Sequence, residues 1–540
     1  MAKLIHRHIA TDRAALIDEA GSRSFSELDT RANQLIHALR GHGIVAGDVI
    51  AIYAGNCAEY YEIMVAASHA GILYVPVNWH FTAEELAYVI DNSEAKLLFA
   101  DAQFSDTARA AMARNETPSL TGCISVRGAI DGFDDYEAFL ATGAKDEPEQ
   151  QTLGGPMFYT SGTTGRPKGV RSASPMTSQG MESMDMMSAG LSGLLSIPKD
   201  GTTLLCGPVY HSAQWAFSFL PLLAGSTVVS RHRFDAAETL QLIDEYQVSN
   251  VHLVPTQFHR LSRLDDATRA KFSGKSLAVV WHGAAPCPPQ VKRRMIDWWG
   301  PVINEYYGST EGSIVTTATS QEWIDRPGTV GKPTPLVEVR IVGEDGALAP
   351  AGTSGQIYVK NRMGTDFIYH KEPAKTAAAH LEPGVFTFGD IGYLDGDGYL
   401  FMSDRKIDMI ISGGVNIYPA EIEAVLTTHP AVQDAAVFGI PNEEYGEEVK
   451  AAIQVRAQHS PTDALARELI EHCRSHLAGY KAPKSIASSP TCPATRPASC
   501  TNACCATCTG RTRAERSRRF APGASPRSRT LAPEQDVRPG

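Results

Sequence analysis

Apolar and polar positions follow two periods along most of the chain, one typical of helices and one of buried strands. Ser26 is expected to cap the helix in FSELDTRANQLIHALRGHG, whose apolar residues recur at helical spacing up to Gly41. VIAIYAG (49–55) is expected as a buried strand, followed by a helix over Cys57–Ala70 and the strand ILYVPVN. The same order recurs around LLCGPVY, STVVSRH, NVHLVPT, LAVVWHG and VINEYYG. This alternation predicts an α/β fold of parallel sheets covered by helices.

The pattern changes near residue 390 and again after Lys484. FTFGDIGYLDGDGYLFMSDRKIDMIISGG is typical of short strands joined by Asp–Gly turns, and a helix, two strands and a helix over Asp463–Leu477 follow. We therefore expect a large N-terminal domain of helix-covered mixed sheets, 1–403, and a small mobile α+β domain, 404–484. Apolar periodicity is lost over 485–540, whose composition predicts a disordered tail.

Length and composition narrow the class of protein. A chain of 540 residues is too long for one hydrophobic core, and 43% hydrophobic with 20% charged residues is typical of a soluble globular protein. The formal charge of −11 argues against nucleic-acid binding, which usually needs a basic face. The first residues lack the apolar run of a secretory signal, and no stretch of about 18 apolar residues predicts a transmembrane segment. A cytoplasmic enzyme is the resulting expectation.

The ten cysteines fall into two groups. Five are scattered singly, which favours reduced thiols over a disulfide framework: Cys57, Cys123, Cys206, Cys287 and Cys473. The other five crowd the tail: Cys492, Cys500, Cys504, Cys505 and Cys508. The crowded group needs a separate explanation.

The stretch YTSGTTGRPKG (159–169) carries the strongest chemical signal. Its backbone can turn successive N–H groups toward one point, with hydroxyls as further donors, which suits anionic oxygens. Lys168 adds a positive charge, although the residue order differs from that of a Walker A loop. A flexible surface loop is the alternative. We predict a phosphate-binding loop formed by Thr160, Ser161, Gly162, Thr163, Thr164 and Gly165.

This stretch resembles the phosphate loop of the AMP-forming acyl-adenylate enzymes, which include acyl-CoA synthetases, peptide-synthetase adenylation domains and luciferases. The family's motifs recur in order up to Lys484, and the chain looks most like a bacterial fatty-acyl-CoA synthetase. YYGSTEG (306–312) resembles the second family signature. The resemblance implies that Tyr306, Tyr307 and Gly308 border the nucleotide, with Tyr307 against adenine, and that Thr310 contacts the α-phosphate.

The resemblance also implies a magnesium site. Glu311 would hold Mg²⁺, with Thr160 as a second oxygen ligand. A carboxylate beside a phosphate site supplies the hard oxygen that Mg²⁺ prefers. A solvated loop carboxylate is the alternative for Glu311.

Three further segments resemble nucleotide-binding parts of the family. In HGAAP (282–286), Gly283, Ala284 and Ala285 resemble the small residues that admit the adenine ring. TFGDIG places Asp390 where the family binds both ribose hydroxyls, and Arg405 is where it reaches ribose or phosphate. A turn aspartate and a surface arginine are weak signals individually, so their order behind the first two motifs carries this assignment.

The implied reaction joins ATP and a carboxylic acid into an acyl adenylate and pyrophosphate, after which CoA takes the acyl group. Lys168, Thr310, Glu311 and His211 are the expected catalytic residues. In the resembling synthetases, glycines like Gly413 and Gly414 line the pantetheine channel, because only glycine lets backbone approach so closely. GYKAPK (479–484) resembles the basic stretch beside the CoA nucleotide. The hinge position, often Asp or Lys in the family, is Ile407 here.

PVYHSAQWAF (208–217) resembles the segment that borders the acyl pocket. Tyr210, His211, Trp215 and Phe217 would form an apolar wall, with His211 as a gate or as a packed histidine. No acidic residue that could hold an amino group follows in this region before Asp235. This favours a fatty or other bulky apolar acid over an amino acid.

The tail departs from the family, which usually ends in a segment like PxxxxGKxxKxxLR whose first lysine acts in adenylation. Residues 485–540 contain nine arginines and no lysine. One GC-rich codon choice for PASCTN (497–502), read two bases on, gives Gly-Lys-Leu-Tyr-Lys. We interpret the tail as the product of a frameshift shortly after Lys484. Zinc binding by the crowded cysteines is the rival interpretation, but their spacings fit no ordinary zinc finger.

Two alternatives to an acyl-CoA synthetase stay open at this point. One is transfer of the adenylate to the phosphopantetheine of a carrier protein, and the other is a nucleotide-binding relic impaired in adenylation. The expected partners are a small carboxylic acid and CoA, and no nucleic acid. The resemblance is compatible with a homodimer and with peripheral membrane contact.

Overall fold

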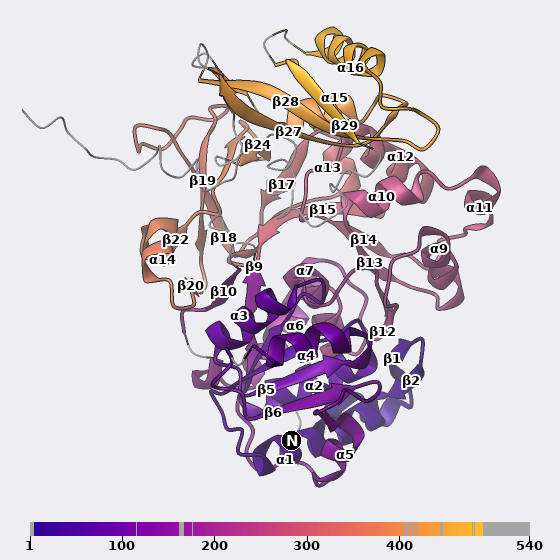
Figure 1. Cartoon of the computed structure of the whole chain (residues 1–540), viewed down its shortest axis with the longest axis vertical. Helices are drawn as coiled ribbons and strands as arrows, with labels where there is room; N and C mark the ends of the chain where they lie inside the picture. Colours follow the sequence, from indigo (N-terminus) through magenta and orange to yellow (C-terminus); the bar gives the residue numbers. More distant parts are fainter. Residues whose placement is uncertain are drawn as a thin grey trace, which may run out of the picture. The chain divides into compact units, whose positions relative to one another are not determined.

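The computed structural model of the chain (Figure 1) describes residues 5–114, 116–160, 167–174, 176–405, 410–412, 415–417, 419–442, 446–477, 479 and 481–489. The fold is mixed α/β, with a large N-terminal and a small C-terminal part, as the sequence predicts. Two compact units divide the chain, Met1–Asp408 and Met409–Gly540. The expected boundary at Asp404 lies within strand β24 (Leu400–Arg405), which belongs to the larger unit.

A six-stranded sheet forms the first half of the larger unit, with strand order β7-β6-β5-β3-β4-β8 and parallel pairing throughout. Its strands are β3 (Val49–Tyr53), β4 (Leu73–Pro76), β5 (Leu97–Asp101), β6 (Gly122–Val126), β7 (Asp134–Asp135) and β8 (Gly155–Pro156). All five residues of β3 are buried, because both faces of the sheet are covered. Ala51 and Tyr53 pack with helices α3 and α4, whereas Ile50 and Ile52 pack with α1 and α2. These helices and the neighbouring α5 span Phe25–Gly41 (α1), Ala58–Ala70 (α2), Ala83–Ser93 (α3), Ser105–Met112 (α4) and Tyr136–Ala141 (α5).

A second, larger sheet begins with parallel strands in the order β1-β12-β11-β13-β14-β15 and continues with antiparallel ones. Leu205 of β11 packs with α1, α2 and α8, whereas Leu204 packs with α9, α10 and α12, so helices cover both faces. Its parallel part comprises β1 (Ala14–Asp18), β11 (Thr202–Leu205), β12 (Thr227–Ser230), β13 (Asn250–Leu253), β14 (Val279–His282) and β15 (Ile303–Ser309). The helices that follow these strands or pack beside them are α6 (Glu182–Leu194), α7 (Ser212–Ala216), α8 (Phe219–Leu223), α9 (Ala236–Glu245), α10 (Pro255–Leu261), α11 (Asp266–Lys271), α12 (Pro289–Trp299) and α13 (Ser320–Asp325). Helices and sheets therefore alternate in five layers through this unit.

The antiparallel end of the larger sheet and a separate three-stranded sheet share another core, which includes Val170, Val315 and Phe386. The antiparallel strands are β2 (Gly21–Ser24), β16 (Ser313–Ala318), β17 (Thr329–Pro333), β18 (Val337–Val342), β19 (Gly355–Asn361), β21 (His380–Glu382), β22 (Val385–Phe386), β23 (Asp390–Leu394) and β24. The small sheet has the order β20-β10-β9, formed by β9 (Phe158–Thr160), β10 (Lys168–Ser172) and β20 (Phe367–Tyr369), with helix α14 (Pro373–Ala379) beside β20.

The smaller unit is α+β and has its own core. Ile422 and Leu426 of α15 and Leu469 of α16 pack on a five-stranded sheet. Its elements are β25 (Ile410–Ser412), β26 (Val415–Ile417), α15 (Pro419–Leu426), β27 (Val432–Asn442), β28 (Gly446–Val455), α16 (Asp463–His476) and β29 (Ser485–Ser489).

The strand β29 corrects the expectation that packed structure ends at Lys484. Ser485–Ser489 pairs in parallel with β28, and Ile486 packs against the core of the smaller unit. Five residues with one apolar side chain carry too little periodicity to be recognised, but backbone pairing to an existing strand needs little side-chain signal. Residues 490–540, the rest of the expected tail, lie outside the described residues.

Two smaller expectations also meet the structure. The scattered cysteines Cys57, Cys123, Cys206, Cys287 and Cys473 are all free thiols, as predicted. The cap of α1 is Ser24 and not Ser26, because the Ser24 hydroxyl accepts the Glu27 N–H while Glu27 reaches back to the Ser24 N–H. Within the described residues, no helix has both the length and the apolar character that crossing a membrane requires.

Candidate active site

A tight turn after β15 carries Thr310 and Glu311. The Ser309 hydroxyl accepts the backbone N–H groups of Glu311 and Gly312, both at 3.1 Å, and so fixes the turn. The pairing of β15 with β16 shifts register between Tyr307 and Gly308, the mark of a β-bulge. A side chain at Gly308 would overlap the carbonyl oxygen of Ser313, so only glycine fits this approach of the two strands.

Lys168 meets Glu311 at this turn. The Lys168 Nζ lies 3.9 Å from Glu311 Oε1, and the two side chains are 18% and 11% exposed. Tyr369 lies between them: its hydroxyl donates to Glu311 Oε1 at 2.9 Å, and Lys168 Nζ is 3.6 Å from the centroid of its ring. Residues from three distant parts of the sequence thus converge on one small, largely desolvated cluster.

Tyr307 and Asp390 form the second polar contact of the site. The Tyr307 hydroxyl donates to Asp390 Oδ2 at 2.7 Å, and Asp390 is 5% exposed as the first residue of β23. Asp390 pairs across the strands with Arg405, the last residue of β24. The order of the sequence motifs therefore does bring Asp390 beside the YYGSTEG strand, with the Arg405 backbone opposite.

The loop after β14 is open where the adenine ring is expected. Gly283 is buried, whereas Ala284 and Ala285 are exposed. A Cβ on Gly283 would lie 2.6 Å from the Tyr306 ring, which explains the glycine. Ala284 has φ 66°, a left-handed conformation that costs energy in a non-glycine residue and that clusters at functional sites.

Tyr306 points away from Tyr307, because neighbouring strand residues face opposite sides of a sheet. Its hydroxyl lies 3.0 Å from His252 Nε2, and Phe217 stacks on His252 with ring centroids 4.6 Å apart. Tyr306 therefore supports the adenine loop from below through Gly283.

The expected apolar wall divides between two clusters. Trp215 packs toward the helices between the two large sheets and donates to Tyr74 Oη at 2.9 Å, whereas Phe217 packs with His252 and Tyr306. The Trp215 N–H is thereby satisfied inside the protein.

His211 stands at the start of α7, with its ring centroid 4.5 Å from that of Tyr210. The residue is accessible to solvent on one side, yet dense protein on the other sides removes enough water to lower its pKa to about 4, with a smaller effect from His80. The imidazole is therefore neutral at physiological pH, as a gate against an apolar pocket requires.

Ser212, the residue after His211, links this wall to the turn. Ser212 Oγ lies 2.8 Å from Thr310 Oγ1. The start of α7 and the expected α-phosphate ligand are thus held by one hydrogen bond between two hydroxyls.

The donor set fits Mg²⁺. Glu311 offers a second carboxylate oxygen beyond the one that Tyr369 occupies, and the Thr160 hydroxyl oxygen is buried without a hydrogen-bond partner among the described residues. No cluster of three or more His, Cys, Asp or Glu side chains in the described residues could hold a metal. This suits a cation bound by one carboxylate together with phosphate oxygens.

Several predicted site residues lie outside the described residues: Ser161, Gly162, Thr163, Thr164, Gly165, Ile407, Gly413 and Gly414. In the basic stretch before the tail, Lys481 Nζ contacts both carboxylate oxygens of Glu421, at 2.8 and 2.7 Å. Both residues belong to the smaller unit.

Sequence reasoning missed Tyr369 and Ser212. Tyr369 lies in FIYHKEP, 58 residues from Glu311, and neither its composition nor its spacing points to a phosphate site. Ser212 follows His211 directly, but only the fold shows that its hydroxyl meets Thr310.

Comparison with known proteins agrees with this geometry. Two family models match the chain, "AMP-binding enzyme" over residues 6–365 and "AMP-binding enzyme C-terminal domain" over residues 421–498. A feruloyl-CoA synthase from Amycolatopsis sp is 32% identical over 467 residues, which cover 86% of this chain and 89% of that protein. The long-chain-fatty-acid–CoA ligase FadD13 of Mycobacterium tuberculosis is 29% identical over 470 residues, covering 86% and 88%. The o-succinylbenzoate CoA synthetase (MenE) from Bacillus subtilis, in complex with its acyl-adenylate intermediate OSB-AMP, matches with a TM-score of 0.76 at 27% identity and covers 91% of this chain and 95% of that chain.

Proposed function

The chain belongs to the AMP-binding enzyme family, and from this premise we propose that it activates a bulky apolar carboxylic acid as acyl-AMP and transfers the acyl group to CoA. It is an AMP-forming acid–CoA ligase that uses ATP, Mg²⁺ and CoA. The observation that carries the site assignment is the meeting of Lys168 and Glu311 beside the turn that holds Thr310.

The chemical difficulty of the first step is charge, because a carboxylate must attack the α-phosphorus of a polyanion. Lys168 supplies a positive charge from a largely buried position, and Thr310 supplies a hydroxyl donor whose place is fixed by Ser212. Such preorganised groups act on the charge that develops in the transition state. Mg²⁺, held by Glu311 and the phosphates, supplies further charge neutralisation when bound.

The nucleoside is oriented by a different part of the chain. Asp390 presents a carboxylate for the ribose hydroxyls, and the Tyr307 hydroxyl on Oδ2 fixes its orientation. The open loop at Ala284 and Ala285 leaves room for the adenine ring. These contacts bind rather than react, so their loss should raise KM for ATP more than it lowers kcat.

The class of acid follows from the wall beside α7. The polar atom of Trp215 is bonded to Tyr74, and the imidazole of His211 is neutral, so neither offers a charge to a polar side chain of the substrate. An α-amino group would need an acidic partner, and the segment from Pro208 to Phe234 contains none. A fatty, aromatic or other bulky apolar acid fits this wall best. The relatives named above act on acids of different shapes, which agrees with a class rather than one compound.

CoA-dependent AMP formation against a panel of acids tests this proposal. Long-chain fatty and hydroxycinnamic acids should give turnover, whereas amino acids of equal bulk should give none. A supplied acyl-AMP should also be converted to acyl-CoA, which reports the second half-reaction alone. Turnover with amino acids, or the absence of turnover with every acid and every supplied acyl-AMP, would exclude the proposal.

Two alternatives give distinct results in the same assay. Transfer to a carrier protein would give AMP with a phosphopantetheine carrier and none with free CoA. A nucleotide-binding relic would bind ATP but release no pyrophosphate with any acid. The relic is favoured only by the absence of lysine after Lys484.

A further inference from the structure

Tyr369 touches both charged groups of the phosphate site through different parts of its side chain. Its hydroxyl donates to Glu311 Oε1 at 2.9 Å, and its ring carries the Lys168 ammonium at 3.6 Å from the centroid. The residue is 7% exposed, so both contacts are shielded from water. A cation over a desolvated aromatic face is held more strongly than one at the surface.

The small sheet places Tyr369 there. Tyr369 of β20 pairs with Val170 of β10, and Lys168 lies two residues before Val170 on the same face. Lys168 and Tyr369 are therefore diagonal neighbours on one face of an antiparallel pair, within reach of long side chains.

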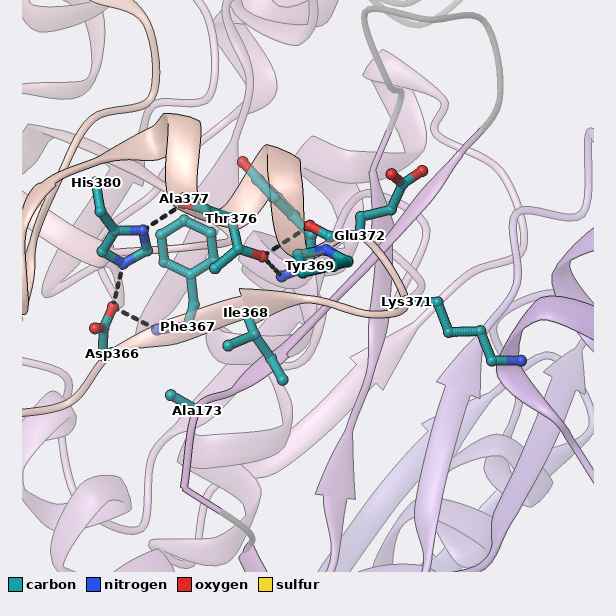
Figure 2. A pocket seen from close by; sticks show the side chains of 11 residues that line it. Ala173, Asp366, Phe367, Ile368, Tyr369, Lys371, Glu372, Thr376, Ala377 and His380 are labelled. Atoms are coloured by element: carbon teal, nitrogen blue, oxygen red, sulfur yellow. Dashed lines mark hydrogen bonds and ion pairs between the residues drawn. The ribbon is translucent and has the colours of Figure 1, made fainter.

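The backbone of Tyr369 is fixed from the other side of the strand. Its N–H donates to Thr376 Oγ1 of α14 at 3.0 Å, and Thr376 in turn bonds the Glu372 carbonyl (Figure 2). The same residues line an open pocket of about 500 Å³. Lys371, two residues after Tyr369, has φ 57°, and Ser313, two residues after Glu311, has φ 58°. Left-handed backbone thus lies close to both ends of the Tyr369–Glu311 hydrogen bond, as is common where a site is held in a set geometry.

The tyrosine also keeps the two charges apart. A direct ion pair between ammonium and carboxylate closes to about 2.8 Å, whereas Lys168 and Glu311 stand 3.9 Å apart. Burial, and then the Glu311 carboxylate, raise the pKa of Tyr369, so its hydroxyl stays protonated and donates. One oxygen of Glu311 is therefore occupied by a neutral donor, and the other keeps its capacity as a ligand.

We propose that Tyr369 is the positioning residue of the metal–phosphate site: it orients Glu311 toward Mg²⁺ and holds Lys168 beside the phosphates while preventing the two from pairing with each other. This inference rests on the proposed function, because it concerns the ATP site assigned above. It adds a residue from a segment that no sequence motif marks.

Substitutions can separate the hydroxyl from the ring. Tyr369→Phe keeps the ring under Lys168 and removes only the bond to Glu311, so it should weaken Mn²⁺ binding to the protein–ATP complex about 10-fold, as loss of a partner to a ligating carboxylate typically does. Its affinity for ATP in EDTA should stay unchanged. Tyr369→Leu removes both contacts and lets Lys168 close onto Glu311, so ATP affinity in EDTA should fall as well. Electron paramagnetic resonance of free Mn²⁺ and calorimetric ATP titration of the full chain measure these two quantities without requiring catalysis.

Tyr136 offers a matched control in the same unit. It is also a buried tyrosine that donates to a glutamate, Glu62, at 2.8 Å, with Arg31 5.8 Å from its ring centroid. Tyr136→Phe should lower the thermal midpoint about as much as Tyr369→Phe and leave Mn²⁺ affinity unchanged.

Each outcome decides between the hypotheses. Unchanged Mn²⁺ affinity in Tyr369→Phe, or an equal loss of metal-free ATP affinity, would overturn the positioning role. A native chain that binds neither ATP nor Mn²⁺ with ATP would instead overturn the proposed function. The phenylalanine variant retains the packing of the ring, so the decision does not depend on whether Tyr369→Leu folds.

Discussion

Two histidines, His69 and His252, are each 1% exposed. Burial lowers the pKa of both to about 3, from an ordinary value of 6.5. The pair must therefore be neutral in the folded chain under all ordinary conditions, while both take up a proton on unfolding below pH 6.5.

Stability should consequently fall with acid. Between pH 6.5 and about 3 the unfolded state binds more protons than the folded state, so each histidine removes about 2 kcal/mol of unfolding free energy at pH 5, and nothing above pH 7. In urea unfolding at pH 7.5 and pH 5.0, His69→Gln should lose about 2 kcal/mol less than the native chain between the two values. The exposed His459 supplies the control, since His459→Gln should keep the native loss. Equal losses in the native chain and in His69→Gln would contradict the prediction.

At the scale of elements, the start of helix α1 shows how close competing signals can lie. Ser24 and Ser26 both precede the apolar stripe, and only Ser24 forms a capping box with Glu27. The hydrogen bonds from Ser24 lower the pKa of Glu27, in agreement with an ionised carboxylate at a helix start. The chain direction out of β2, which ends at Ser24, decides between the two serines.

This assignment predicts different costs for two neighbouring substitutions. Ser24→Ala should lower the unfolding free energy by about 1 kcal/mol, because it removes the acceptor for the Glu27 N–H. Ser26→Ala should change it by less than about 0.5 kcal/mol, since a substitution away from a cap or core is usually near neutral. Urea unfolding of the two variants side by side checks the order, and a larger cost at Ser26 would refute it.

At the scale of the whole molecule, the unresolved question is the chain beyond β29. One choice of third codon bases from Cys492 to Ala506, read two bases on, gives Pro-Arg-Asn-Pro-Ala-Gly-Lys-Leu-Tyr-Lys-Arg-Val-Leu-Arg. This sequence fits the PxxxxGKxxKxxLR pattern at every fixed position. In this frame the second bases of cysteine codons fall at the end of leucine or valine codons, which explains why cysteines crowd here. The packed strand β29 ends just before this segment, so the frameshift hypothesis requires no change in the described fold.

The frameshift hypothesis makes a paired prediction. A chain carrying the reframed end should form acyl-AMP about 10²–10³ times faster than the chain as printed, because it regains a charge that acts in the transition state. Conversion of supplied acyl-AMP to acyl-CoA should differ much less between the two chains. Pyrophosphate release and acyl-CoA formation measure the two steps, and the nucleotide sequence after codon 484 provides the direct check. A gene without this second frame, or equal adenylation by both chains, would contradict the hypothesis.

Much of the site is legible in the sequence because its chemistry is concentrated in short motifs. The turn that carries Thr310 and Glu311 and the aspartate at 390 are recognisable from local residue types, and the structure brings Tyr307 and Asp390 into contact. The strands and helices of the α/β fold are likewise encoded locally, since each apolar run reports its own burial.

What the sequence alone determined is the order of elements and the chemical character of the motifs, because both depend on neighbouring residues. The tertiary structure decided which distant side chains share a site: Tyr369 between Lys168 and Glu311, and Ser212 on Thr310. Those contacts depend on strand pairing and register, and a pairing between residues far apart in the chain leaves no trace in local composition. The same reason explains β29, whose weak side-chain pattern becomes a strand only because β28 offers it a partner.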